Sequence, residues 1–115
     1  MDPFPKQHEL ISIFESEPEL LDLDAPWTYN RLTFKTQRGS DHIAYVIEPA
    51  SRIVQIDWSR DGNRVVSLDL NSVSSLEVVT ETPIETITAH FREDGSLQPC
   101  VLQLKPTVRL SWGVT

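Results

Sequence analysis

Three histidines and a single cysteine are the side chains of this sequence best suited to nucleophilic or acid–base catalysis. They are His8, His42, His90 and Cys100. A catalytic cysteine needs a partner base and an electropositive setting that lowers its pKa. The strand pairing inferred below puts Cys100 and His90 on opposite faces of a sheet. We therefore expect Cys100 to pack as a small core residue, as unpaired cysteines usually do, and we expect no catalytic site.

Metal-binding and cofactor-binding motifs are also missing from the sequence. There is no Cys-x-x-Cys, His-x-x-x-His or His-Glu-x-x-His spacing, so no zinc site is predicted. The glycines are scattered and form no phosphate-binding loop. The run Asp61-Gly62-Asn63 occurs in part of a calcium loop, but the remaining ligands are absent and a hairpin turn explains it. We expect no cofactor, no metal and no enzymatic activity.

The charge balance limits what the protein could bind. The chain has 10 basic and 17 acidic residues, which gives a formal net charge of −7. Nucleic-acid binders need a basic face that displaces counterions from phosphates, so no nucleic-acid partner is expected. An acidic surface keeps a domain soluble, and it also attracts partners with a basic surface.

Length and hydropathy indicate one domain in a reducing compartment. The 115 residues are predicted to form a single domain, 1–115. One cysteine cannot form an internal disulfide. The first residues lack the pattern of a signal peptide, and no apolar run approaches the roughly 18 residues of a membrane span. We expect a cytoplasmic location and no membrane partner.

The apolar residues follow two different periods along the chain. In the helical N-terminal segment, 1–26, Leu10, Ile11 and Phe14 have helical spacing, and a second short turn is predicted over 17–23. In the β-meander, 27–115, apolar and polar residues alternate in about eight short runs separated by turn residues. The predicted fold class is mainly β (α+β). A short N-terminal helix packs on a strongly twisted, about eight-stranded antiparallel meander sheet or partial barrel. A sandwich of two sheets is the alternative.

Apolar faces and turn residues together predict how the strands pair. Directly opposed residues of an antiparallel pair share one face of the sheet. Placing Phe34 opposite Tyr45 centres a hairpin on Gly39-Ser40, which suits a type II′ turn. Placing Ala89 opposite Cys100 centres another hairpin on Asp94-Gly95, a strong type I′ signal. The other predicted pairs are Tyr45 with Ile56, Trp58 with Val66 across an odd-numbered loop centred on Gly62, Leu70 with Leu76, and Val78 with Ile87.

The same pairing gathers three carboxylates on the polar face of the sheet. Asp69 is predicted to lie between Gln55 and Glu77, with Asp57 one step along. Paired carboxylates also serve glycosidases, but no aromatic platform for a sugar accompanies these three. They are interpreted either as a solvated face or as a surface that receives a basic ligand.

Two aromatic residues connect the helical segment to the first long strand. If Trp27 and Tyr29 are buried, they staple the segment to the sheet; if they are exposed, they are candidate interface anchors, because Trp and Tyr are enriched at binding hot spots. The predicted partner-binding residues are Asp57, Asp69, Glu77, Trp27 and Tyr29, with the acidic segment 15–24 as a second source of charge.

These features favour binding over catalysis. A small acidic β-rich domain suits the inhibition of a basic protein, as in toxin-neutralising immunity proteins, because charge steers it towards a cationic cleft before apolar groups make contact. The leading hypothesis is a non-catalytic protein-binding module of this inhibitor or immunity type. Two alternatives stay open. One is a structural homo-oligomer that pairs through exposed strand edges at 32–36 and 108–112. The other is a small-ligand-binding protein that uses the interior of a curled sheet.

Overall fold

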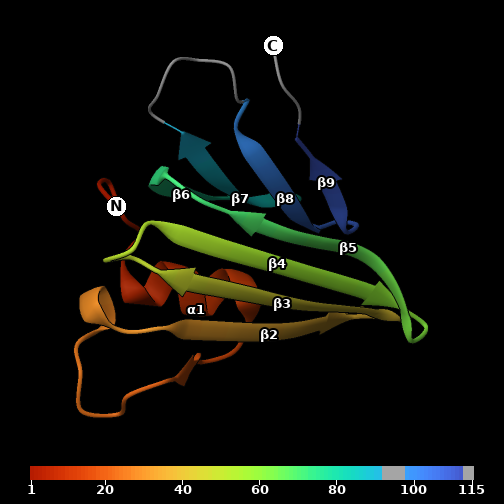
Figure 1. Ribbon diagram of the computed structural model, residues 1–115. Coiled ribbons are helices and arrows are strands. Elements are labelled where there is room, and N and C mark those ends of the chain that lie inside the picture. Colours follow the sequence, from red (N-terminus) through yellow and green to blue (C-terminus); the bar gives the residue numbers. More distant parts are fainter. Residues whose placement is uncertain (92–97, 113–115) are drawn as a thin grey trace.

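The computed structural model describes residues 1–91 and 98–112, and these form one short helix and two antiparallel sheets (Figure 1). In chain order the elements are α1 Gln7–Phe14, β1 Glu19–Leu20, the 3₁₀ turn η1 Trp27–Tyr29, β2 Leu32–Arg38, β3 Asp41–Glu48, β4 Ile53–Arg60, β5 Asn63–Leu70, β6 Val73–Glu81, β7 Ile84–Phe91, β8 Cys100–Lys105 and β9 Arg109–Ser111. One sheet has the order β1-β2-β3-β4-β5 and the other β6-β7-β8-β9. The predicted mainly β class with a short N-terminal helix is confirmed.

Helix α1 is shorter than the segment predicted to be helical. Its N-terminus follows Lys6, whose backbone N–H donates to the Glu9 carboxylate over 2.8 Å. It ends at Phe14 and is followed by Glu15, which has the left-handed backbone conformation (φ 55°) common at helix C-termini. Within the described residues, no helix is long and apolar enough to cross a membrane.

The second helical turn predicted over 17–23 is wrong. Pro18 disfavours a helical conformation in the residue before it, and the next two residues form strand β1. Glu19 pairs with Thr33 and Leu20 with Leu32. The same contact covers part of strand β2, and the Ser16 hydroxyl donates to the Lys35 carbonyl over 2.8 Å. Strand β1 therefore pairs with the first two residues of the edge predicted to be exposed at 32–36, and β9 is the last strand of its sheet.

Five of the six predicted strand pairings are confirmed. They are Phe34 with Tyr45, Tyr45 with Ile56, Trp58 with Val66, Val78 with Ile87, and Ala89 with Cys100. The predicted pair of Leu70 with Leu76 is wrong, because β5 and β6 lie in different sheets. The chain turns a corner between them at Ser72, whose φ is 60°. Leu70 and Val73 on either side of the corner are both buried in the same core.

Of the hairpin loops predicted from glycine positions, one forms as predicted and one has a different length. The two-residue loop Gly39-Ser40 forms as predicted, with φ 61° at Gly39. The odd-numbered loop predicted around Gly62 is wrong, because Asp61 and Gly62 alone connect β4 to β5, and both have positive φ (52° and 80°). Val65 is the extra residue of a β-bulge, since Trp58 pairs with Val66 and Ser59 with Arg64. The Asp94-Gly95 turn lies outside the described residues.

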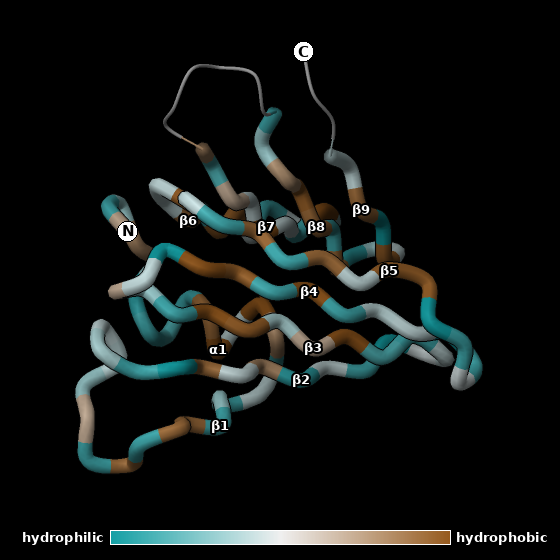
Figure 2. The backbone as a smooth tube through the Cα atoms, in the orientation of Figure 1, coloured by the Kyte–Doolittle hydropathy of each residue, from teal (hydrophilic) through white to brown (hydrophobic). Residues whose placement is uncertain are grey.

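A single apolar core lies between α1 and the inner faces of both sheets. Helix α1 contacts β2, β6 and β7, and Figure 1 shows it lying across the back of the five-stranded sheet. Phe14 stacks on Phe34 with 4.8 Å between ring centroids and lies 5.4 Å from the Tyr45 ring. Polar and apolar residues alternate along the strands (Figure 2), so each sheet turns one apolar face inwards and one polar face to solvent.

The buried face of α1 differs by one residue from the prediction. Leu10 and Phe14 are buried as expected, but Ile13 is the third buried residue and Ile11 is only partly buried. Ile13 fits between the two sheets because it lies three residues after Leu10, on the same side of the helix.

Candidate protein-binding surface

The three predicted carboxylates do not form one cluster. Asp57 lies opposite Ser67, and Asp69 lies opposite Gln55, as predicted. Both side chains are exposed on the outer face of the five-stranded sheet. Glu77 is on β6 in the other sheet, where its carboxylate lies 3.1 Å from Nε2 of His90. The cluster is divided because its prediction depended on hydrogen bonding between β5 and β6.

Other carboxylates are engaged in ion pairs with basic side chains of the same chain. Glu15 pairs with Arg38 and, at 3.6 Å, with Lys105, and the hydrogen bond from Arg38 lowers the pKa of Glu15. The Asp41 carboxylate accepts from Arg60 and from the Trp58 indole N–H over 2.7 and 2.8 Å. The Arg60 hydrogen bond is the main cause of the lowered pKa of Asp41. These groups add less to a free acidic surface than the unpaired acids do.

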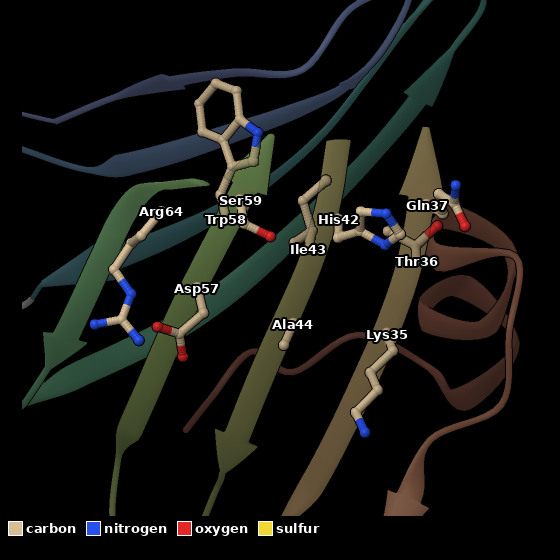
Figure 3. Close-up of a pocket in the computed structure, with 10 residues that line it drawn as sticks. All are labelled: Lys35, Thr36, Gln37, His42, Ile43, Ala44, Asp57, Trp58, Ser59 and Arg64. Atoms are coloured by element: carbon tan, nitrogen blue, oxygen red, sulfur yellow. The ribbon is translucent and has the colours of Figure 1, made fainter. Parts of the chain in front are cut away.

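The outer face of the five-stranded sheet contains a hollow of about 420 Å³ (Figure 3). Two small side chains, Ala44 and Ser59, lie at its base on the central strands. Longer polar side chains border it, among them Lys35, Arg64 and Asp57. Because both signs of charge surround it, the hollow suits a polar group of a partner better than an apolar ligand. The signal in the sequence is the pair of small residues at outward positions of β3 and β4.

The two aromatic residues at the start of the β-meander have different surroundings. Trp27 is half-buried and meets Phe34 edge to face, with 6.0 Å between ring centroids. Tyr29, two residues later, is 77% exposed. Trp27 therefore staples the turn η1 to the core, while Tyr29 is available to a partner.

The loop before β2, residues 21–29, projects from the body of the protein (Figures 1 and 2). Leu21 and Leu23 in this loop are 78% and 84% exposed. Asp22 and Asp24 alternate with them and are exposed too. The exposure of these leucines was not predicted, because the segment 17–23 was expected to form a short helical turn.

The buried side chain of Asn30 holds this loop in place. It is 6% exposed and uses all its hydrogen-bonding capacity on backbone groups. Its amide nitrogen donates to the carbonyls of Asp22 and Ala25 over 2.6 and 3.0 Å. Its oxygen accepts from the N–H groups of Asp22 and Arg31 over 3.1 and 2.9 Å. The sequence shows an asparagine next to a loop, but not which backbone groups it reaches.

The potentially reactive groups of the core are shielded from solvent. Cys100 is 1% exposed, and burial raises its pKa to about 11. Burial also raises the pKa of Tyr45, whose hydroxyl has no hydrogen-bond partner in the described part of the chain. The prediction that Cys100 is a core residue is confirmed. Among residues 1–91 and 98–112, no three His, Cys, Asp or Glu side chains are grouped to hold a metal ion.

Comparison of the sequence with protein-family models and with curated proteins finds no match. The structure is similar to one chain of the solved contact-dependent growth inhibition toxin–immunity protein complex from Klebsiella pneumoniae 342. The TM-score is 0.82 and the sequence identity 17%, over 97% of this chain and 96% of that chain. The two chains therefore share a fold along nearly their whole length.

Proposed function

We propose that this protein is a non-catalytic binding module of the immunity type, which neutralises a partner protein with a basic surface. The observation that carries the proposal is the fold shared with a chain of a toxin–immunity complex, at a TM-score of 0.82. A domain whose whole fold recurs in a two-protein complex is a reasonable candidate for a similar assembly.

Charge supports the immunity role over the toxin role. The net charge of −7 favours rapid encounter with a basic protein, since opposite charges steer two proteins together. Asp57 and Asp69 stand exposed on the outer sheet face and contribute to this field, and so do the exposed acids before β2. Glu77 lies on the other sheet, so it does not add to the charge of this face. The buried thiol of Cys100, with its raised pKa, is a poor nucleophile.

The two alternatives have less support. A ligand carrier needs space inside the curled sheets, whereas large side chains such as Tyr45, Phe14 and Phe34 fill the region between the helix and the sheets. A homo-oligomer that pairs through strand edges finds the first two residues of β2 already paired with β1. Two copies of an acidic chain also repel each other.

The test is capture followed by quantitative binding. The tagged chain is incubated with lysate of its source cell at low salt, and the retained protein is identified, expressed and purified. The expected partner is a single basic protein that binds one to one. Its association rate should fall at least about tenfold between roughly 50 mM and 500 mM salt, as screening shortens the reach of charge.

A growth assay of cells that express each protein distinguishes the immunity role from the toxin role. The partner alone should arrest growth, and co-expression of this chain should restore it. Arrest by this chain alone would instead make it the toxin component. Failure to retain any basic partner, or binding that is indifferent to salt, would refute the proposal.

A further inference from the structure

We infer that the loop of residues 21–29 is the anchor of the complex, with Leu21, Leu23 and Tyr29 entering an apolar pocket that basic side chains surround on the partner protein. This inference rests on the proposed function and adds the surface and the chemistry of its partner. The acidic outer sheet face then serves long-range attraction, while the loop makes the close contact.

The first argument is the concentration of exposed apolar side chains. Among the described residues, six large apolar side chains are at least 39% exposed, and three of them lie in this one loop. Those three are also the most exposed, at 77% to 84%, whereas Val65, Ile84 and Trp112 range from 39% to 49%. Scattered apolar residues on a surface need no explanation, whereas these three lie within nine residues of the chain, which supports a shared role in binding.

The second argument is that the loop is built in advance. Asn30 makes four hydrogen bonds to the backbone of the loop and its neighbour while being 6% exposed. At the end of the loop, Trp27 packs on Phe34 and fixes the turn η1, which also contains the exposed Tyr29. A loop that is already ordered loses little conformational entropy on binding, which favours affinity.

The third argument is that the charge of the loop determines which kind of partner can bind it. Asp22 and Asp24 alternate with the exposed leucines, and both residues are exposed, although the Asp22 carboxylate also accepts from the Asp24 backbone N–H over 2.9 Å. A pocket for this loop therefore needs an apolar floor for the leucines and lysine or arginine at its border for the aspartates. A second copy of this chain is a poor occupant, because the acidic loop meets an equally acidic protein. An anionic membrane surface repels it for the same reason.

The experiment compares two kinds of apolar variant in binding to the purified basic partner. The double variant Leu21→Ser/Leu23→Ser removes the contact at the loop. The matched control Val65→Ser/Ile84→Ser removes two exposed apolar side chains elsewhere. We expect the loop variant to raise the Kd at least about 30-fold, as truncation of hot-spot residues does, and the control to change it less than about twofold.

Two further variants separate charge from shape. Asp24→Asn keeps the size of the side chain, and it should lower the association rate a few-fold with little change in the dissociation rate. Asn30→Ala should raise the Kd about fivefold or more, through the dissociation rate, because the loop loses its fixed shape. Amide hydrogen exchange should then quicken in residues 22–31 and stay unchanged in β3 and β4. If exchange quickens but the Kd is unchanged, Asn30 orders the loop without affecting binding. That result would count against the inference.

The outcomes distinguish the two proposals. If the unaltered chain binds no basic partner, the proposed function fails and the inference fails with it. If the unaltered chain binds and the Leu21→Ser/Leu23→Ser variant binds equally well, only the inference is wrong. If the free chain is a dimer that this variant dissociates, the occupant is a second copy and the inference is also wrong.

Discussion

Replacing Tyr45 with phenylalanine removes a hydroxyl from the centre of the core without changing the shape of the ring. Tyr45 is fully buried, and its hydroxyl has no hydrogen-bond partner in the described part of the chain. An unsatisfied buried polar group costs about 1–3 kcal/mol. The variant should therefore raise the free energy of unfolding by about 1 kcal/mol, which corresponds to roughly 4 °C in Tm for a domain of this size.

The pH dependence of the free energy of unfolding provides a second test of the Tyr45 hydroxyl. Burial raises the pKa of Tyr45 above its ordinary value of 10.0. Above pH 10 the unfolded chain loses this proton and the folded chain keeps it. The free energy of unfolding should then fall by about 1.4 kcal/mol per pH unit. Phenylalanine has no proton to lose, so the variant should lack this part of the alkaline decrease.

The assay is urea unfolding of both proteins between pH 7 and pH 11. Cys100 has a pKa raised from 9.0 to about 11, so it adds its own loss of stability from about pH 9 upwards. It does so in both proteins, and the difference between them isolates Tyr45. A phenylalanine variant that is clearly less stable at pH 7 would show that the hydroxyl is satisfied in solution, and one that keeps the full alkaline decrease would show that Tyr45 does not cause it.

Three further predictions test the helix, the thiol and the first hairpin. Phe14→Ala should lower the free energy of unfolding by about 3–5 kcal/mol, because it empties the core between helix and sheets, whereas the exposed Ser12→Ala on the same helix should change it by less than about 0.5 kcal/mol. Equal effects in urea unfolding would contradict this packing. Cys100 should react with a thiol reagent at pH 8 at least about 100-fold more slowly in the folded protein than in urea, since it is 1% exposed and roughly one molecule in a thousand carries the thiolate. Fast labelling of the folded chain would show that the thiol is accessible. Gly39→Ala should cost about 1 kcal/mol, because φ is 61° there and a Cβ is strained at that angle; an unchanged urea midpoint would count against the turn geometry.

Strand pairing was largely predictable because two independent features agree. Phe34 and Tyr45 share a face, and the glycine between their strands supplies the positive φ that a two-residue turn needs. The bulge at Val65 could not be predicted, because the alternating residues Val66, Leu68 and Leu70 all follow it and keep their regular spacing. The parity argument then wrongly assigned an odd-numbered loop at Gly62.

The alternation of apolar and polar residues also could not predict that the strands divide into two sheets. Leu70 and Val73 point into the core whether the sheet continues or turns a corner, so alternation alone does not distinguish the two. The grouping of Glu77 with Asp57 and Asp69 failed for that reason. For Tyr29 the sequence left burial and exposure open, and the structure shows that it is exposed. The exposure of Leu21 and Leu23 could not be predicted, because it depends on a strand, β1, that only tertiary contacts create.

The central claim is that this acidic domain binds and neutralises a basic protein. The most direct measurement is the association rate of the purified chain with its captured partner, followed as salt is raised. We expect a one-to-one complex whose association rate falls about tenfold or more while the dissociation rate changes little. A rate that is indifferent to salt, or the absence of a basic partner at any salt concentration, would contradict the claim.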